Sequence, residues 1–466
     1  MITRVEIDGF RNFIDFSVDL YPLQVIAGPN SSGKSNFFDL LLLLSRLAGN
    51  DNLSIAFSGI RGDPIQQFTT SKPGTFLKTI RIAVEAIVPK RIRDPWGETA
   101  DLKNTHLRYS LQLNVDKGTH GSPLINISDE KLTTLRKKES LSKLVHFKTT
   151  NIFKKYLIWG KRSPDCISTE RNKGKVVLHQ DSRSGRKREY HLKDLQGTVL
   201  SAANTATFPH AFAMRQELSK INQLQLEPEA LRKPSKIGIF KDSQEQRFGI
   251  HGSNMPAVVA RIKEKDPKLL ALISSDLRSV VKDAKSVDVY KDEIHDQYIA
   301  QVLFTHGGPF PASLLSDGTL RILSLSTMKH DDQNEGVLCF EEPENGIHPE
   351  CMRGLLRILK GLALDEDEST TKTRHYSNLR QVLVNTHSPS LVSIVEQKNL
   401  LFAETSRYYS EKLNDTVLVG RFLHVRDELP LRSPREQRQF ITRNEVIDFL
   451  STVKKENWIE DKQHEE

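Results

Sequence analysis

The sequence is poor in the features that mark secreted, disulfide-rich and membrane proteins. It has three cysteines in 466 residues, at positions 166, 339 and 351, and no CxxC pair. This excludes a disulfide framework and a structural zinc site of the CxxC type, and favours a reducing compartment. Purely apolar runs are no longer than the five leucines at 40–44, far short of the ~20 residues of a membrane span. Residues 1–6 lack the apolar core of a signal peptide. We therefore expect a soluble, cytoplasmic protein that does not use a membrane.

Acidic residues are scarce in one stretch, residues 131–193, which we call the basic segment. It holds 18 Lys and Arg residues against five Asp and Glu residues, a net charge of +13, so the rest of a chain of net charge +8 carries −5. The segment could follow a nucleic-acid backbone, dock an acidic partner protein, or be a solvated face. It has few aromatic side chains to stack on bases, which disfavours sequence-specific reading of single strands. Non-specific contact with DNA or RNA is the interpretation we favour, with the clusters 136–138 and 186–188 as its centres.

Periodicity predicts the elements. Alternating apolar and polar residues predict antiparallel strands, at 5–8, 16–20, 80–88, 107–115 and 298–305. Short apolar runs predict buried strands, at 23–27, 336–340 and 381–385, and helical spacing predicts helices, at 36–47, 256–285, 315–328, 350–362 and 444–453. From about 122 to 195 the pattern weakens to short strand-like pieces at 176–179 and 189–192, which we interpret as an insertion. The acidic run 365–371 is expected to be a solvated loop. Helices that alternate with buried strands predict a parallel or mixed α/β sheet.

The residues between the buried strand 23–27 and the helix 36–47 match the pattern GxxxxGK[ST]. They are Gly28, Pro29, Asn30, Ser31, Ser32, Gly33, Lys34 and Ser35, followed by Asn36. In such a loop the backbone amides at the helix N-terminus wrap the phosphates, the lysine neutralises the β- and γ-phosphates, and the final serine binds Mg²⁺. We predict that these residues bind ATP and Mg²⁺.

A second motif follows the buried strand 336–340, where Glu341 and Glu342 come in succession. The carboxyl ends of parallel strands meet at one edge of a sheet, so these acids are expected beside the phosphate loop. Adjacent residues of a strand point to opposite sides, and their roles must therefore differ. We predict that Glu341 is the acid on the metal side and that Glu342 is the general base toward the attacking water.

Two smaller motifs gain meaning from their order. Ser316 and Gly318 begin a predicted helix, where a serine side chain and a glycine amide could bind a phosphate. His387 follows the buried strand 381–385 and could contact the γ-phosphate. Alone, each motif is more often structural.

Together, the phosphate loop, LSDG, FEEPE and NTHSP resemble the head of an ABC-type ATPase of the SMC/RecF/OLD branch, and more closely the AAA_21-type ATPases of bacterial anti-phage defence systems. The resemblance covers roughly 1–90 and 250–405, with IDGFRNF at 7–13 and GSNMPAVV at 252–259. It implies an α/β ABC-type P-loop ATPase head, with a mixed sheet, helices and an antiparallel β subdomain, here carrying a large basic insertion. It also assigns Ser316 and Gly318 to the signature, Glu341 and Glu342 to Walker B, His387 to the switch histidine, and 345–349 to the D-loop. The Q-loop residue stays open among Gln66, Gln67 and Gln112.

The sequence departs from the family pattern in places. Glu341 stands where Asp is usual, and His348 stands where the D-loop commonly has Asp. Sustained heptads are missing, which excludes a long coiled-coil arm. No DxD follows His387, as a Toprim nuclease would need, so effector chemistry is expected from a separate chain.

The resemblance also implies an assembly, because the family closes nucleotide on one subunit's phosphate loop with the signature of its partner. We therefore predict a homodimer or higher homo-oligomer through ATP-sandwiched heads. The expected parts are the N-terminal half of the head at 1–120, a basic insertion subdomain at 121–250, the C-terminal half at 251–405, and an extension for partner contact at 406–466. The functional hypothesis is an ATPase that senses infection or nucleic acid and controls a separate nuclease or toxin in an anti-phage defence system. The alternative is a RecF-like DNA-repair ATPase acting directly on DNA.

Overall fold

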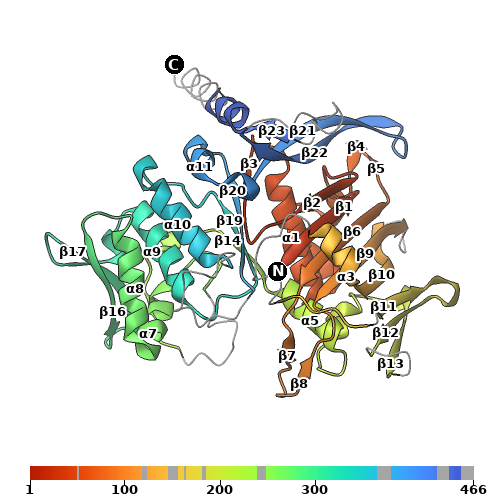
Figure 1. Cartoon of the computed structure of the whole chain (residues 1–466), viewed down its shortest axis with the longest axis horizontal. Helices are drawn as coiled ribbons and strands as arrows, with labels where there is room; N and C mark the ends of the chain where they lie inside the picture. The colour runs from red at the N-terminus through yellow and green to blue at the C-terminus, as the bar shows by residue number, and fades with distance from the viewer. Residues whose placement is uncertain are drawn as a thin grey trace.

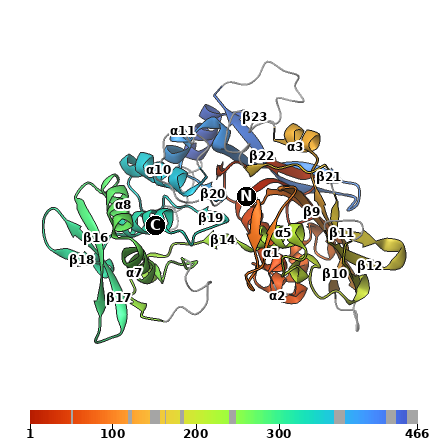
Figure 2. The ribbon, with the colours of Figure 1, turned by 60° about the horizontal axis from the view of Figure 1, so that its bottom comes forward.

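The computed structural model describes residues 1–49, 52–117, 123–144, 156–161, 164–180, 185–238, 248–364, 379–427 and 440–452. Figure 1 shows an antiparallel sheet on the right, a helical lobe on the left, and a largely parallel sheet between them. Figure 2 shows the same three parts after a rotation, with the helical lobe still on the side away from the antiparallel sheet. In the part of the chain that the structure describes, no helix combines the length and the apolar character needed to cross a membrane.

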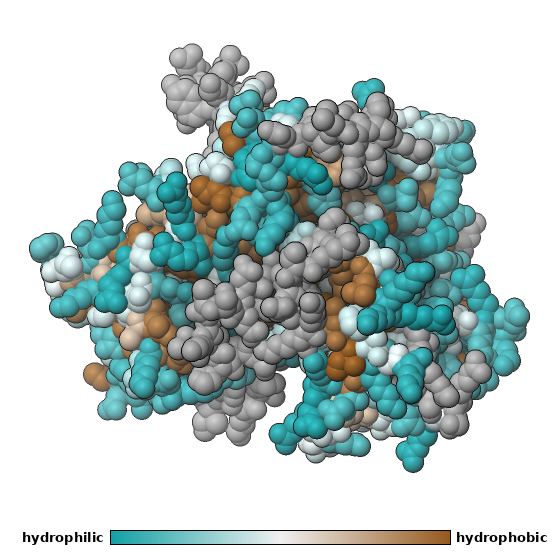
Figure 3. Space-filling model, viewed as in Figure 1, coloured by the Kyte–Doolittle hydropathy of each residue, from teal (hydrophilic) through white to brown (hydrophobic). Residues whose placement is uncertain are grey.

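An eight-stranded antiparallel sheet contains the N-terminal strands in the order β13-β12-β11-β10-β9-β6-β1-β2. The sequence predicts β1, β2, β6 and β9 from their alternation of apolar and polar residues, and β12 and β13 as short strand-like pieces. The strands are β1 (Ile2–Asp8), β2 (Phe16–Asp19), β6 (Thr79–Ile87), β9 (His106–Lys117), β10 (Pro123–Thr134), β11 (Asp165–Glu170), β12 (Lys175–His179) and β13 (Lys187–His191). The described strands of the basic segment are thus the outer strands of this sheet, and polar side chains (teal) cover this side of the molecule in Figure 3.

A seven-stranded sheet forms the centre, in the order β14-β19-β20-β3-β21-β22-β23. Its first five strands run parallel, and β22 returns antiparallel to β21. Their bounds are β3 (Leu23–Ala27), β14 (Ile221–Leu224), β19 (Val337–Glu341), β20 (Gln381–Thr386), β21 (Leu400–Ser410), β22 (Asp415–Arg426) and β23 (Phe440–Thr442). Every residue of β3 and β20 is buried, as their continuous apolar runs predict. The α/β fold class is confirmed.

Helices cover both faces of the central sheet. Helix α1 (Lys34–Ala48) packs on the face that carries Ile26, Cys339 and Leu383. Helices α9 (Asp317–His330) and α10 (Met352–Leu362) pack on the opposite face, with Phe340 and Val384. The predicted phosphate loop and the predicted signature therefore lie at the starts of helices on opposite faces of one sheet.

The helical stretch predicted at 256–285 is two helices and the start of a strand. Helix α7 (Met255–Lys265) ends because Asp266 caps the next helix, with its carboxylate accepting from Lys268 N at 2.9 Å, and Pro267 takes the first position of α8 (Pro267–Arg278). From Ala284 the chain enters a sheet of four strands. These are β15 (Ser235–Lys236), β16 (Ala284–Asp292), β17 (Gln297–Phe304) and β18 (Pro309–Pro311).

Residues 121–250 are shared between the larger parts of the fold. Strands β10 to β13 extend the antiparallel sheet, α5 (Pro209–Ser219) packs on α1, and β14 is an edge strand of the central sheet. The division of the chain into four parts, and the insertion itself, stay predictions. The acidic run 365–371 lies outside the described residues, and the predicted helix 444–453 is helical over 443–452, where the description ends.

Smaller elements complete the chain. The helices are α2 (Leu53–Ser58), α3 (Lys137–Lys143), α6 (Pro228–Leu231) and α11 (Pro389–Ile394), and the strands pair as β4 (Thr70–Lys72) with β5 (Thr75–Phe76) and β7 (Arg91–Arg93) with β8 (Thr99–Asp101). Single 3₁₀ turns are η1 (Pro64–Gln67), η4 (Arg171–Lys173), η5 (Leu192–Asp194), η6 (Leu200–Ala202), η7 (Ala312–Leu314), η8 (Pro349–Cys351) and η10 (Gln397–Asn399).

Candidate nucleotide-binding site

The phosphate loop connects β3 to α1, and its two glycines stand where a side chain would collide. A Cβ on Gly28 would lie 2.3 Å from the carbonyl oxygen of Ala403 on β21, and one on Gly33 would lie 2.7 Å from Asn12 Nδ2. Gly33 has a φ of 101°, and Ser31 has a φ of 64°. This backbone leads directly into the N-terminus of α1, as a loop that binds phosphate requires.

The side chain of Lys34 is held over this loop by carbonyl oxygens of the loop backbone. Its Nζ donates to the carbonyl oxygens of Gly28 at 2.8 Å and Pro29 at 2.7 Å, and the side chain is buried. Burial lowers the pKa of Lys34 to about 8, while the negative charges of Glu342 and Glu341 act in the opposite direction. The amine therefore lies near the charges of the two acids before any ligand binds. A bound polyphosphate anion would stabilise its protonated form.

A network of polar side chains supports the first turn of α1. Asn36 donates from Nδ2 to Asn12 Oδ1 at 2.9 Å and accepts at Oδ1 from Arg11 Nη1 at 2.8 Å. Arg11 also donates to Asp39 Oδ2 at 2.5 Å. The GFRNF motif of the sequence thus lies against the phosphate loop. Arg11 and Asn12 were not among the predicted site residues, although that motif signalled them.

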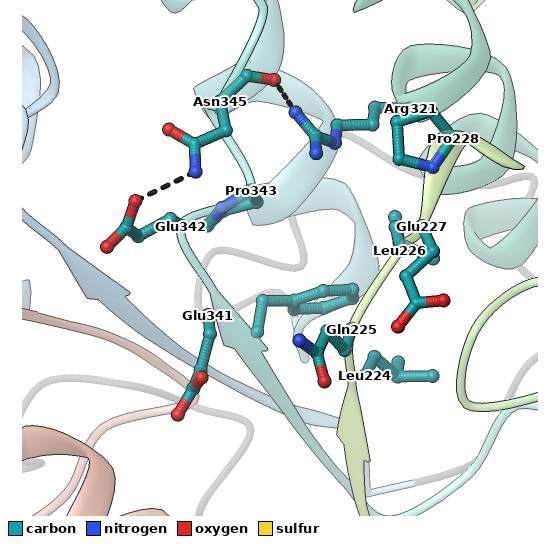
Figure 4. Close-up of a pocket in the computed structure, with 11 residues that line it drawn as sticks. Leu224, Gln225, Leu226, Glu227, Pro228, Arg321, Glu341, Glu342, Pro343 and Asn345 are labelled. Carbon is teal, nitrogen blue, oxygen red and sulfur yellow. Dashed lines mark hydrogen bonds between the residues drawn. The ribbon is translucent and has the colours of Figure 1, made fainter. Parts of the chain in front are cut away.

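The two acids of the second motif end β19 and diverge. Glu341 is its last residue and Glu342 has a φ of 46°, so their carboxylates point away from each other in Figure 4. Glu342 Oε2 accepts from Asn345 Nδ2 at 2.8 Å, and its Oε1 lies 3.9 Å from His387 Nε2. The backbone amide of Glu342 donates to Asn385 O at 2.9 Å, which ties β19 to β20 at this edge. The structure therefore brings Glu342 and His387 together, and places the charges of both acids near Lys34.

A glutamine that sequence reasoning missed reaches the metal-side acid. Gln223 lies on β14, directly beside β19, and its Nε2 donates to Glu341 Oε1 at 3.3 Å. The three glutamines considered from the sequence bond elsewhere: Gln67 accepts from Arg11, Gln66 accepts from the amide of Asp63, and Gln112 accepts from Arg81. Gln223 is thus the better candidate for the open Q-loop position.

The signature residues lie at the start of α9. The hydroxyl of Ser316 accepts from Thr319 N at 3.3 Å and so caps the helix, while a Cβ on Gly318 would lie 2.5 Å from Gly346 O in the predicted D-loop. Arg321 on the same helix donates to Asn345 O. Across the described residues, no hydrogen bond joins Ser316 or Gly318 to the phosphate loop. The residues predicted to form the signature thus begin a helix on the face of the sheet opposite α1.

A hollow of about 300 Å³ opens beside the acids. Gln225 and Glu227 line it from the chain after β14, Arg321 lines it from α9, and Glu341 and Glu342 line it from the end of β19 (Figure 4). Among the described residues, no group of three His, Cys, Asp or Glu side chains could hold a metal by itself. A Mg²⁺ ion bound with a nucleotide takes one or two oxygen ligands from the protein and the rest from phosphates and water. The Ser35 hydroxyl and the Glu341 carboxylate are the oxygen donors of the right kind.

Solved structures that the chain matches include SMC head domains. An SMC head bound to the C-winged helix domain of ScpA has 12% identity and a TM-score of 0.46, and the match covers 90% of this chain and 97% of that one. The SMC head domain of Thermotoga maritima has 10% identity and a TM-score of 0.38, with 91% and 99% covered. An Smc head of Pyrococcus furiosus with an extended coiled coil, bound to the C-terminal domain of ScpA, has 10% identity and a TM-score of 0.42, with 90% and 96% covered. At these identities and scores the likeness is distant.

No curated protein matches the chain. A family model does: residues 23–90 and 174–393 match AAA_21, described as "AAA domain, putative AbiEii toxin, Type IV TA system". The matched ranges make up more than half of the chain and contain the phosphate loop, the signature, both acids and His387. The chain belongs to the AAA_21 family of P-loop ATPases.

Proposed function

We propose that this protein is an ABC-type ATPase that binds and hydrolyses ATP with Mg²⁺ and closes as a dimer of heads around the nucleotide. The observation that carries the proposal is the meeting of Lys34, Glu342 and His387 at one edge of the central sheet. Lys34 is bonded to its loop, and Glu342 lies 3.9 Å from His387. Three groups of complementary chemistry from three distant parts of the sequence converge there, as phosphoryl transfer to water requires.

In the proposed reaction each residue has a separate task. Lys34 and the loop amides bind the β- and γ-phosphates, and Ser35 and Glu341 would hold a magnesium ion, which supplies charge neutralisation when bound. Glu342 accepts a proton from the attacking water. At the same time the water oxygen bonds to the γ-phosphorus, and the bond between the γ-phosphorus and the β–γ bridging oxygen breaks. His387 steadies the γ-phosphate and the carboxylate of Glu342, and Asn345 holds that carboxylate from the other side.

The position of the signature supports a closed dimer. Since α9 packs on the face opposite α1, the proposal is that Ser316 and Gly318 cover the nucleotide of a second chain. The description of the family names a toxin and a toxin–antitoxin system. It supports the finer part of the proposal, that the ATPase senses infection or nucleic acid and controls a separate nuclease or toxin in a cytoplasmic anti-phage defence system.

Two substitutions test the site. Lys34→Ala should abolish ATP binding, measured by titration with a fluorescent nucleotide, because the phosphates lose their buried cation. Glu342→Gln should bind ATP but lose at least about a hundredfold in turnover, because it lacks the proton acceptor, and should accumulate as dimer in mass photometry. Lys360→Ala and Glu396→Gln are matched controls, since these residues form a surface ion pair away from the site. Parent-like binding and turnover in both site variants would contradict the assignment.

A specific observation keeps the RecF-like alternative in view. Several exposed cations of the basic segment form no ion pair within 4 Å among the described residues: Arg136, Lys138, Lys161, Arg186 and Lys193. Others are neutralised, such as Lys175 by Glu189 at 2.7 Å. Exposed cations without an ion-pair partner suit a phosphate backbone. Charge reversal of Arg136 and Lys138 should weaken non-specific DNA binding and reduce its salt dependence. ATP turnover that depends on DNA with no effector chain present would favour direct action on DNA.

A further inference from the structure

A buried amide at the edge of the central sheet is left without hydrogen bonds. Asn385 on β20 is 3% exposed, and neither its Oδ1 nor its Nδ2 has a partner. Of the side chains that the structure describes, this is the one in which two buried polar atoms are both unsatisfied. An unmade hydrogen bond in the interior costs free energy, so a side chain that keeps two of them calls for an explanation.

The same strand carries an amide of the opposite kind. Gln381 lies four residues earlier and is fully buried. Its Oε1 accepts from Ile2 N at 2.9 Å, and its Nε2 donates to Ile2 O at 2.8 Å and to Tyr21 O at 3.0 Å. Gln381 thus shows what a structural amide on this strand does: it joins the central sheet to the antiparallel one. Asn385 has no such task.

Strand register places Asn385 among the catalytic groups. It pairs with Glu341 on β19 and with Ile26 on β3, two residues before Gly28. Leu383, two residues earlier on β20, packs on the face that α1 covers, so alternation puts the Asn385 side chain on that face as well. The amide therefore lies between the metal-side acid and the strand that leads into the phosphate loop.

We propose that Asn385 is a positioning residue for the metal-bound nucleotide: its Oδ1 accepts a hydrogen bond from a metal-coordinated water and its Nδ2 donates to a phosphate oxygen. The side-chain amide has one oxygen, which accepts, and one nitrogen, which donates, and a phosphate alone would leave Oδ1 unsatisfied. A water on a divalent cation is a strong donor, and Glu341, the neighbour in register, is the acid expected to hold the metal through water. The inference rests on the proposed function and adds a residue that couples metal to nucleotide.

The test compares Asn385→Leu with the parent in the full chain, using a non-hydrolysable fluorescent ATP analogue with Mg²⁺ and with EDTA. The variant should lose roughly tenfold in affinity with Mg²⁺ and clearly less in EDTA, where only the contact of Nδ2 with phosphate is lost. Without nucleotide, its unfolding temperature should equal or exceed that of the parent, because no hydrogen bond is lost. Gln381→Leu is the control and should lower the unfolding temperature.

A second variant changes the charge and keeps the shape. Asn385→Asp should weaken binding of the analogue in EDTA, since a carboxylate repels phosphate, and should strengthen the dependence of binding on Mg²⁺. If Asn385→Leu lowers the unfolding temperature as Gln381→Leu does, or keeps the Mg²⁺ dependence of the parent, the amide is structural and the inference is wrong. A parent protein that binds no analogue would instead contradict the proposed function itself.

Discussion

At the scale of single residues, Lys34 shows how the fold prepares a charge for a ligand. Its amine is buried and bonded to the carbonyl oxygens of Gly28 and Pro29, which are neutral acceptors. Desolvation by burial outweighs the charges of Glu342 and Glu341 and lowers the pKa to about 8. The proton on this amine is thus held less tightly than on an ordinary lysine, and an anion with several negative charges would tighten it again.

This balance predicts a pH dependence of nucleotide binding. Bound polyphosphate raises the pKa of Lys34 above its value of about 8 in the free protein, so binding above that pH takes up a proton. Affinity should stay level below about pH 7. Above about pH 8 it should fall by close to tenfold per pH unit, because each further unit lowers the protonated fraction of the amine in the free protein about tenfold. Nucleotide titrations from pH 6.5 to 9.5 measure this. Lys34→Arg, whose charge does not titrate in this range, should bind with a flat profile, and a flat profile in the parent would contradict the pKa argument.

At the scale of elements, the sequence predicts those whose pattern is local. The runs that become β3, β19 and β20, and the loop between β3 and α1, are each complete within a few residues. Strand β14 has no such local pattern, because four residues are too few to show a period. It lies beside β19 only in the folded chain, where Gln223 bonds to Glu341 across 118 positions of sequence. The Q-loop candidate was missed for that reason. The hairpin of β21 and β22 was missed too, although its Ala403 lies against Gly28 and fixes the shape of the loop.

Strand β10 escaped prediction because a carboxylate interrupts its pattern. Glu130 is fully buried there. Its oxygens accept from the amides of Val199 at 2.7 Å and Leu200 at 2.8 Å, and from Tyr109 Oη at 3.1 Å. The preceding residue, Thr198, donates from its hydroxyl to Leu47 O at the end of α1, at 2.7 Å. Glu130 thus links the antiparallel sheet to the segment that packs on the helix of the phosphate loop.

Glu130 should give the fold a pH dependence of its own. Burial raises its pKa from 4.5 to about 7, so between these values the folded protein holds a proton that the unfolded chain has lost. Stability from this group is therefore complete below about pH 4.5 and declines as pH rises to about 7. Urea unfolding of parent and Glu130→Gln at pH 5.5 and 8 should show the parent losing about 2 kcal/mol more than the variant over this interval. Equal losses would show that Glu130 does not titrate there.

At the scale of the whole molecule, one sheet separates two half-sites. The phosphate loop starts α1 on one face, and Ser316 caps α9 on the other, where Gly318 packs against the predicted D-loop. Under the proposed function, a single chain would supply a nucleotide-binding half and a covering half on opposite faces of this sheet. Two chains related by a twofold axis would then bring each half against its complement.

Mixing two defective chains tests this arrangement directly. Lys34→Ala removes the binding half and Ser316→Arg blocks the covering half, so each variant alone should lack ATP turnover. In an equal mixture half of the dimers are mixed and each of those has one intact site, so turnover should recover to about a quarter of the parent value. Asp266→Arg, which removes the cap of α8 in the same lobe, controls for the loss of a helix cap and should keep parent activity after allowance for stability. A mixture as inactive as its components would contradict the arrangement across two chains. Turnover by Ser316→Arg alone would show that Ser316 does not take part in the site.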